Sequence, residues 1–220
     1  LALAGAPPSL DAHQNSSSYA RDICFHIFES LYARGEDGAP IPDLAEGFKI
    51  SSDGKTYTFA LRHGVKFHNG KEMGPADVVA SIERYRKIGV SAKLIEGIDT
   101  VEATGPQEVT VTLKQNEATF LDALATPRGP ISIYPEEEAN KAPEQLKLIG
   151  TGPYKFVEYV PDSHVKLARF DDYAVNDAYK DRNGFAGRKE VFLDEITFRF
   201  MPDAAAQVAG LQAGEIQFIE

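Results

Sequence analysis

The chain has 220 residues, which is enough for one large domain or two small ones with a buried hydrophobic core. Hydrophobic residues make up 43% of it and aromatic residues 10%, a composition typical of folded proteins and not of disordered ones. Its 33 acidic residues outnumber its 23 basic residues, so the formal charge of -10 argues against nucleic acid or an anionic membrane surface as the main partner.

The first half of the chain alternates between helical and strand patterns. Apolar residues recur at helical spacing over residues 18–32, after a run of serines at 16–18 that are candidate N-caps. Residues 47–50 and 56–61 flank the turn sequence SSDGK and predict a β-hairpin. Residues 74–88 predict a helix that starts with Pro75 and carries Asp77 in its first turn.

The second half is richer in strand patterns. Residues 108–113 alternate and predict a strand, and residues 116–125 predict a short helix capped by Asn116. The runs YKFVEYV, HVKLARF and EITFRFM predict three further strands. Near the end, Asp203 is expected to cap a helix that Gly214 terminates, with a strand over residues 216–219.

Side chains that could carry catalysis or bind a metal are scattered. The five histidines lie in unrelated contexts, no Gly-x-Ser-x-Gly elbow is present, and His63 and His68 are expected to be solvent-exposed in a hairpin. The single cysteine, Cys24, excludes an internal disulfide or a multi-cysteine zinc site and is predicted to be a buried apolar residue. The acidic run at 136–138 is read as the solvated first turn of a helix. We therefore expect no catalytic residue, no metal site and no cofactor.

The segment LIGTGPYKFVEY, residues 148–159, concentrates glycine and proline just before a strand. It is not a dinucleotide-binding fingerprint, because Lys155 stands where the third glycine should be and a strand follows where a helix is needed. The triplet that begins at Asn15 matches the N-glycosylation sequon, but such triplets are frequent by chance.

Taken together, these segments resemble the extracellular solute-binding proteins of family 5, which include the dipeptide- and oligopeptide-binding components of ABC importers. PPSLDAHQ is similar to the family's opening strand and turn, and IFESLY to its first helix. Residues 44–85 give the most specific match, a hairpin followed by a helix entry, and GTGPYKFVEY, LARFDDY and PDAAAQVAGLQAGEI follow in order. The chain departs from the family at Gly74, where Ser or Thr is usual, and at Gln217, where Asp is usual.

The resemblance implies an α/β fold: a periplasmic-binding-protein-like lobe one, with a mixed sheet, flanking helices and a smaller inserted α+β subdomain. Residues 1–35 and 150–220 would form the discontinuous main subdomain and residues 36–149 the insert. Lobe two would be absent, making the chain an N-terminal fragment. GTGPY would mark the return to the main sheet, with Gly150 and Gly152 adopting backbone angles forbidden to other residues and with Tyr154, Phe156 and Glu158 on one strand face.

The resemblance also implies a function. The whole protein would be the substrate-binding receptor of an ABC-type importer, capturing a short peptide or a similar polar solute by hinge closure and delivering it to the membrane permease. It would be periplasmic or extracytoplasmic, without a signal peptide in this chain, and monomeric when full length. The alternative is an extracytoplasmic enzyme or chaperone-like module that reuses the same fold.

Five residues are candidates for ligand binding. By the resemblance, Asn15, Ser17, Ser18 and Tyr19 lie in the loop that borders the cleft, where hydroxyls and free backbone N–H groups suit a polar or anionic ligand; simple N-capping is the competing interpretation. Arg128, in a loop rich in proline and glycine, could reach a carboxylate or could be a surface charge.

Overall fold

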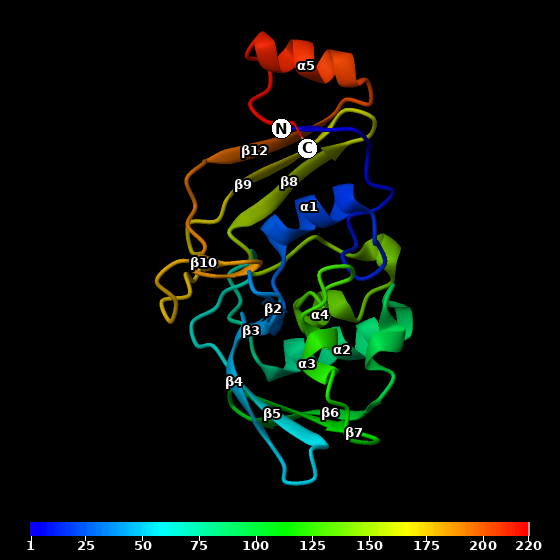
Figure 1. Cartoon of the computed structure of the whole chain (residues 1–220), viewed down its shortest axis with the longest axis vertical. Coiled ribbons are helices and arrows are strands. Elements are labelled where there is room, and N and C mark those ends of the chain that lie inside the picture. The colour runs from blue at the N-terminus through cyan, green and yellow to red at the C-terminus, as the bar shows by residue number, and fades with distance from the viewer. Residues whose placement is uncertain (220) are drawn as a thin grey trace.

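The computed structural model describes residues 1–219, and Figure 1 shows an elongated molecule with a four-stranded sheet toward each end. The upper sheet has the order β1 (Ala2–Leu3), β12 (Glu195–Phe200), β9 (His164–Arg169) and β8 (Tyr154–Val160). β1 runs parallel to β12, whereas the other pairs are antiparallel. The sheet is therefore mixed, and all three strands predicted from residues 154–201 are confirmed.

The lower sheet is antiparallel throughout, in the order β4 (Ala45–Ile50), β5 (Thr56–Leu61), β7 (Glu108–Leu113) and β6 (Ile98–Gly105). β5 and β7 alternate buried and partly exposed residues, so one face of the sheet packs inward. Helix α2 (Pro75–Ile88) packs on β6 and β7 from that side. The predicted hairpin, strand and long helix are all confirmed.

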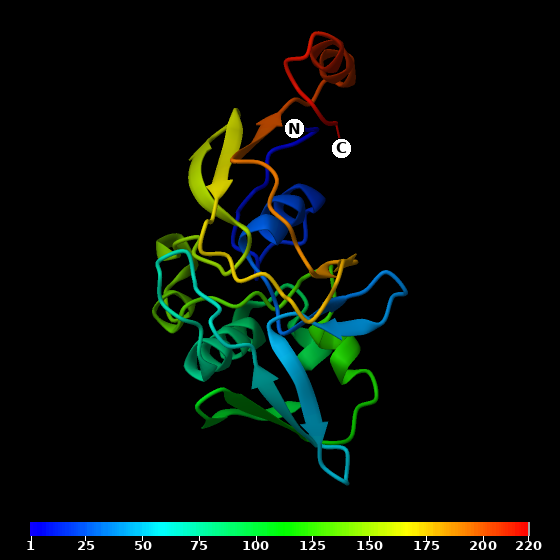
Figure 2. The same ribbon diagram turned by 90° about the vertical axis from the view of Figure 1, so that its left-hand side faces the viewer.

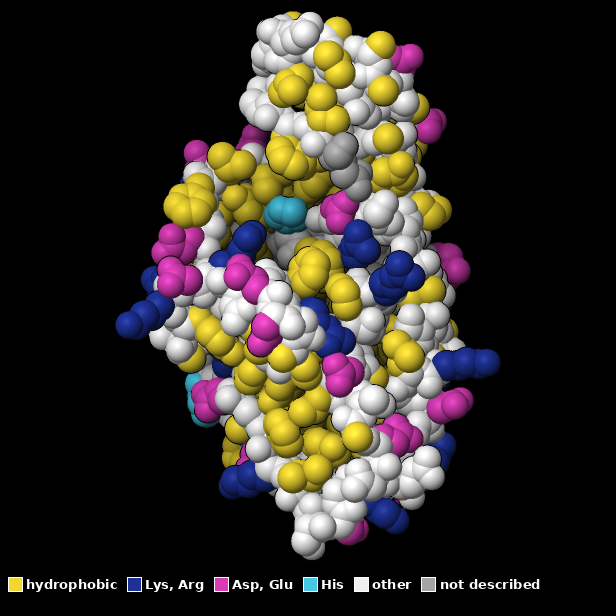
Figure 3. Space-filling model, in the orientation of Figure 1, with side chains coloured by type: hydrophobic (Ala, Val, Ile, Leu, Met, Phe, Trp, Pro, Cys, Tyr) yellow, Lys and Arg dark blue, Asp and Glu magenta, His cyan; other side chains and the backbone are white. Residues whose placement is uncertain are grey.

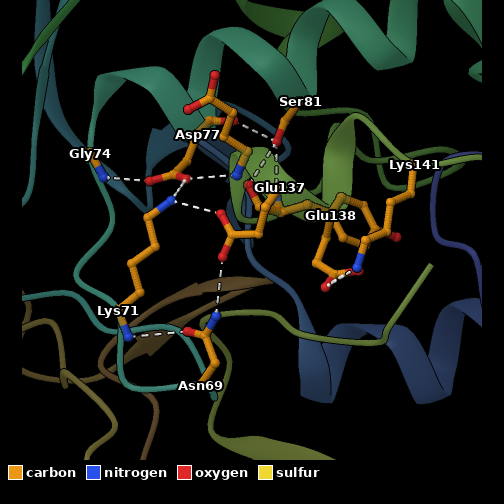
Figure 4. Close-up of polar contacts among 10 residues, drawn as sticks. Asn69, Lys71, Gly74, Asp77, Ser81, Glu137, Glu138 and Lys141 are labelled. Atoms are coloured by element: carbon orange, nitrogen blue, oxygen red, sulfur yellow. Dashed lines mark hydrogen bonds and ion pairs between the residues drawn. The ribbon is translucent and has the colours of Figure 1, made fainter. Parts of the chain in front are cut away.

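The start of α2 is fixed by a polar network that reaches helix α4 (Glu136–Ala139), shown in Figure 4. The buried Asp77 carboxylate accepts hydrogen bonds from the Gly74 N–H at 2.9 Å and the Glu136 N–H at 2.7 Å, and it pairs with Lys71 Nζ at 2.6 Å. The expectation that residues 136–138 are all solvated is wrong for Glu138, which is buried and pairs with Lys141 at 2.7 Å.

Helix α1 (Ser18–Ile27) is shorter than the predicted 18–32. From Phe28 the backbone is extended, because its polar groups bond to distant segments: Ile133 N–H to Glu29 O and Leu44 N–H to Ser30 O. The residues that follow form β2 (Tyr32–Arg34), which pairs with β3 (Pro40–Pro42). IFESLY is therefore mostly a crossing segment between the two sheets and not a helix.

Three smaller predictions are also corrected. α3 (Phe120–Leu124) has Thr119 and not Asn116 at its N-cap position, and the Thr119 side chain makes no capping hydrogen bond. PPSLDAHQ contains no strand, since the opening strand lies earlier, at β1. On β8 a register shift between Phe156 and Glu158 breaks the alternation, so the half-buried Tyr159 faces inward in place of the exposed Glu158.

Gly150 and Gly152 are needed for a different reason from the one predicted. Neither has a positive φ. A Cβ on Gly150 would lie 2.0 Å from the carbonyl oxygen of Ile27, and one on Gly152 would lie 2.6 Å from that of His26. Both glycines therefore allow the chain to pass directly against the last turn of α1.

His68 binds the same segment. The prediction that it is solvent-exposed is wrong, because its side chain is mostly buried. Its Nε2 donates to Gly152 O at 2.9 Å, and its Nδ1 accepts from the Gly150 N–H at 3.3 Å. Burial lowers the pKa of His68 to about 4, which keeps the ring neutral and able to do both. His63, by contrast, is exposed as expected.

The last part of the chain lies at the top of the molecule (Figure 2). α5 (Ala204–Gln212) begins at Asp203, whose side chain accepts from the Ala206 N–H at 2.7 Å, and Gly214 follows it with a φ of 75°, as predicted. Residues 216–219 do not form a strand; one parallel bridge joins Ile219 to Ala2. Hydrophobic side chains are visible on α5 in Figure 3.

Two clusters of buried apolar residues underlie the two sheets. One joins α2 to the lower sheet and the other joins α1 to the upper sheet. The remaining elements are short: η1 (Ala92–Ile95), η2 (Pro143–Gln145), β10 (Arg182–Asn183) and β11 (Ala186–Gly187). Cys24 is buried as predicted. Within residues 1–219, no helix has the length and apolar character to cross a membrane.

Candidate ligand-binding groove

A tight turn at Asn15 precedes helix α1, which lies at the junction between the two sheets. The Asn15 side chain accepts a hydrogen bond from the Ser17 N–H at 2.8 Å and donates one to Ser9 O at 2.6 Å. Ser17 occupies the N-cap position, but its hydroxyl makes no capping bond. The turn therefore comes from Asn15, and the predicted capping role of the serine side chains is not observed.

The loop of residues 126–132 lies opposite α1 and is held in place by hydrogen bonds from two buried side chains. His13 Nε2 donates to Ser132 O at 2.8 Å, and the Tyr85 hydroxyl donates to Gly129 O at 2.6 Å. His13 is fully buried between the edges of Tyr85 and Tyr134. Burial lowers the pKa of His13 to about 4, so a neutral ring holds the loop.

The β10–β11 hairpin forms a third wall. The Phe185 ring stacks on Phe25 of α1 with 4.7 Å between centroids, and the Phe185 N–H donates to Arg34 O at 2.9 Å. Gly184, with a φ of 59°, makes the turn that brings the hairpin this close to Arg34. The hairpin thus adds an aromatic surface beside the exposed side of α1.

A buried ionic cluster fixes the chain just after the hairpin. Lys189 Nζ lies 2.7 Å from Glu29 Oε1 and 3.1 Å from Asp43 Oδ1. Tyr173 and Thr151 hydroxyls also donate to Glu29, each at 2.9 Å. These contacts tie the crossing segment, the lower sheet region and the 171–192 loop to one another.

The cluster divides its charge unevenly between the two carboxyl groups. Burial alone would raise the pKa of Glu29, but Lys189 and three hydrogen bonds to its carboxylate outweigh burial and lower it. Burial and the neighbouring Glu29 raise the pKa of Asp43 to about 6, although Lys189 opposes them. The two carboxylates raise the pKa of Lys189 despite its burial. Glu29 is therefore the firmly ionised partner of Lys189.

These walls enclose two adjoining hollows, which together we call the groove. The aromatic hollow is shallow, with an interior volume of about 20 Å³, and is lined by Phe25, Phe28, Tyr32, Phe185 and the ionic cluster. The cationic hollow, with an interior volume of about 10 Å³, is lined by Asn15, Arg21, Cys24 and Arg128 among others. Both include Phe25, Pro127, Pro130 and Ser132, so they form one continuous feature. In Figure 3, Lys and Arg side chains are interspersed with Asp and Glu side chains across the middle of the molecule, at the height of α1 in Figure 1.

The groove brings together two of the five candidate residues, Asn15 and Arg128. Ser17, Ser18 and Tyr19 do not line either hollow. The ring of Tyr19 instead lies against Gly5, where a Cβ would come within 2.6 Å of it. A ligand-binding role for these three residues stays a prediction.

Several lining residues were missed by the sequence analysis, above all Phe25, Arg21, Phe185 and Lys189. Phe25 carried a detectable signal, because it is a large aromatic residue off the buried stripe formed by Ile23 and Ile27. Among residues 1–219, no group of three or more His, Cys, Asp and Glu side chains is arranged to hold a metal ion.

Solved structures with the same architecture define the class of protein. The chain superposes on NikA from Brucella suis in complex with Fe(III)-EDTA with a TM-score of 0.83 at 28% identity, covering 98% of this chain and 41% of that one. It also superposes on the oligopeptide-binding protein AppA from Bacillus subtilis in complex with a nonapeptide, with a TM-score of 0.79 at 30% identity, over 98% and 42% of the two chains. The fold is therefore that of lobe one of a periplasmic binding protein, as predicted.

The sequence comparisons define the family. Residues 39–220 match the family described as "Bacterial extracellular solute-binding proteins, family 5 Middle". The chain is 32% identical to the glutathione-binding protein GsiB of Pectobacterium atrosepticum (99% of this chain, 41% of the relative) and 36% identical to AppA of Bacillus subtilis (97% and 39%). The chain belongs to the family 5 extracellular solute-binding proteins, and it spans about 40% of the length of these relatives.

Proposed function

We propose that the whole protein is the substrate-binding receptor of an ABC-type importer and captures a short peptide or a similar polar solute. The observation that carries this proposal is an open groove at the junction of the two sheets, in a chain whose relatives are named as peptide- and glutathione-binding proteins. Its combination of aromatic walls with a few charged groups suits a small amphipathic solute.

In this proposal the groove supplies one half of the binding surface and a second lobe supplies the other. A ligand held between two lobes favours the closed form, because it makes contacts there that it lacks in the open form. The closed receptor would then deliver the solute to the permease subunits. The division into a main subdomain (1–35 and 150–220) and an insert (36–149) is part of the same proposal. The apolar clusters of the two sheets support it in the main, although Leu31 and Tyr32 join the lower cluster and Tyr134 and Ala139 the upper one.

The relatives named above are binding proteins, and binding by hinge closure requires no covalent step. We accordingly propose a receptor that is not an enzyme, works outside the cytoplasm and is monomeric when full length. Asn15 and Arg128 are proposed to contact the ligand. An extracytoplasmic enzyme on the same fold is the competing function.

Thermal unfolding of the full-length receptor tests the proposal, with dipeptides, oligopeptides, sugars, opines and nickel complexes as added solutes. A solute at about 100 times its Kd should stabilise the protein by about 2.7 kcal/mol. The 220-residue chain alone should bind the same solute about a thousandfold more weakly if half of the contacts, worth about 4 kcal/mol, are lost. If no solute stabilises the full-length protein while a model ester is turned over, the receptor function is wrong and the enzyme is favoured.

A further inference from the structure

The cationic hollow differs from the rest of the protein in its charge. Two guanidinium groups, Arg21 and Arg128, line it, and none of its described lining residues is an aspartate or glutamate. The chain as a whole carries ten more acidic than basic side chains. Because acidic side chains are in excess over the whole chain, two arginines with no carboxylate beside them in the lining would not be expected by chance.

The two guanidinium groups also keep their hydrogen-bonding capacity. Within residues 1–219, Arg128 makes no hydrogen bond or ion pair, and Arg21 forms an ion pair with its neighbour Asp22 only through Nε, at 3.6 Å, which leaves its two terminal NH2 groups without a partner. Five other arginines are paired with carboxylates, namely Arg34, Arg84, Arg86, Arg169 and Arg188. A guanidinium has five N–H donors, so both groups in the hollow can bind an added anion.

The remaining surface of the hollow adds no opposing charge. Ala12, Ala20 and Cys24 line it, and burial raises the pKa of the Cys24 thiol, so it stays protonated. The amide of Asn15 is committed to Ser17 and Ser9. In the adjoining aromatic hollow, by contrast, Lys189 already neutralises the Glu29 carboxylate. The positive charge of the groove that no lining carboxylate offsets is therefore confined to one end.

We propose that the cationic hollow binds a carboxylate group of the captured solute, through Arg21 on α1 and Arg128 on the facing loop. A planar carboxylate matches the guanidinium fork and forms charge-assisted hydrogen bonds with it. The apolar part of the same solute lies against Phe25 and extends into the aromatic hollow. This inference rests on the proposed receptor function and adds the orientation of the ligand on this lobe.

The test uses the full-length receptor and two probes that differ only in charge, N-acetylphenylalanine and N-acetylphenylalaninamide. Arg21→Gln, Arg128→Gln and the double variant remove the guanidinium groups, and Arg182→Gln, at an exposed site on β10 outside both hollows, is the control with the same charge change. Calorimetric titration should show the carboxylate probe binding about tenfold to a hundredfold more weakly to the double variant. Binding of the amide probe should not change, and Arg182→Gln should match the wild type.

Side-chain NMR of the arginine Nε–Hε groups gives a second readout that does not depend on which solute the receptor transports. Saturable shifts of the Arg21 and Arg128 signals with N-acetylphenylalanine, absent with the amide, support the inference. It is overturned if neither signal shifts, if both probes weaken equally in the double variant, or if Arg182→Gln has the same effect. These outcomes differ from failure of the receptor function, which the solute screen on the unmodified protein reveals.

Discussion

The lower sheet and helix α5 differ in how completely their apolar surface is buried. In the lower sheet, Phe59, Val109 and Val111 have no exposed surface, and α2 covers the face they form. In the upper part, α5 buries only Gln207 and Gly210 and leaves Val208 51% exposed. Because buried apolar area is the main source of stability, the lower sheet should contribute far more to the free energy of unfolding than α5 does.

A pair of truncations tests this comparison and has the largest expected effect. Phe59→Ala should lower the free energy of unfolding by about 3–5 kcal/mol, because it leaves a large cavity in a closed core. Leu211→Ala on α5 should cost less than about 0.5 kcal/mol, because Leu211 is 42% exposed. Urea unfolding of the two variants gives both values. Equal losses would show that α5 is packed as tightly as the core of the lower sheet.

The junction is tested next, through the ionic cluster. Lys189→Met should cost about 3 kcal/mol, since it leaves two buried carboxylates, Glu29 and Asp43, without their cation. Arg188→Met, one residue earlier, removes an exposed ion pair with Asp177 and should cost less than about 1 kcal/mol. Chemical denaturation measures both. A Lys189 variant as stable as the Arg188 variant would mean that the cluster does not hold the junction together.

Close packing at the same junction predicts a third difference. Gly150→Ala should destabilise the protein by about 2 kcal/mol, because the added methyl group meets the Ile27 carbonyl oxygen. For a chain of this size that corresponds to a fall in Tm of about 4–8 °C. Gly47→Ala, where nothing lies within 4 Å of the added Cβ, is the matched control and should change Tm very little. A harmless Gly150→Ala would contradict the close approach to α1.

Per pH unit, the pH dependence of stability is the smallest of the four effects. His13 has a pKa of about 4 when folded, below its ordinary 6.5, so the unfolded state binds more protons between these values. Its contribution to stability is complete above pH 6.5 and is lost as the pH falls toward 4, at up to about 1.4 kcal/mol per pH unit. His68 acts in the same direction, and Asp43, with its raised pKa, opposes both between about pH 4 and 6.

His13→Gln isolates the share of this histidine, because the amide can still donate to Ser132 O but does not titrate. The free energy of unfolding, measured between pH 4.5 and 7.5, should fall less steeply with acid in the variant than in the wild type. Parallel curves would show that His13 is not the titrating group.

Much of the fold could be predicted from local pattern because the relevant forces are local. Alternating residues gave β5, β7, β8, β9 and β12, while Pro75, Asp77, Asp203 and Gly214 marked helix ends through their own backbone chemistry. The predictions failed where the conformation of a segment is set by contacts with residues far away in the sequence. Residues 28–32 have a helical pattern, but their carbonyl oxygens accept hydrogen bonds from the N–H groups of residues 43–45 and 133, which no local pattern reveals.

The groove was harder to predict for the same reason. Arg128 was a candidate because a lone arginine in a loop is visible in the sequence, whereas Asn15 was a candidate through the family resemblance. Phe185 and Lys189 lie more than 140 residues from their partners Phe25 and Asp43, so only the folded chain brings them together. Ser17, Ser18 and Tyr19 came from the family resemblance, and their role awaits a ligand.

The pairing of β1 has a consequence for the time course of synthesis. β1 lies between β12, its parallel partner from nearly 200 residues later, and Ile219, which bridges to it from the other side. At the usual 5–20 residues per second, a ribosome takes roughly 10 s or longer to supply those partners. Until then the opening strand stays unpaired, so it can pass through a membrane pore or be bound by another protein as an unfolded segment. The lower sheet, whose strands come from residues 45–113, can form long before.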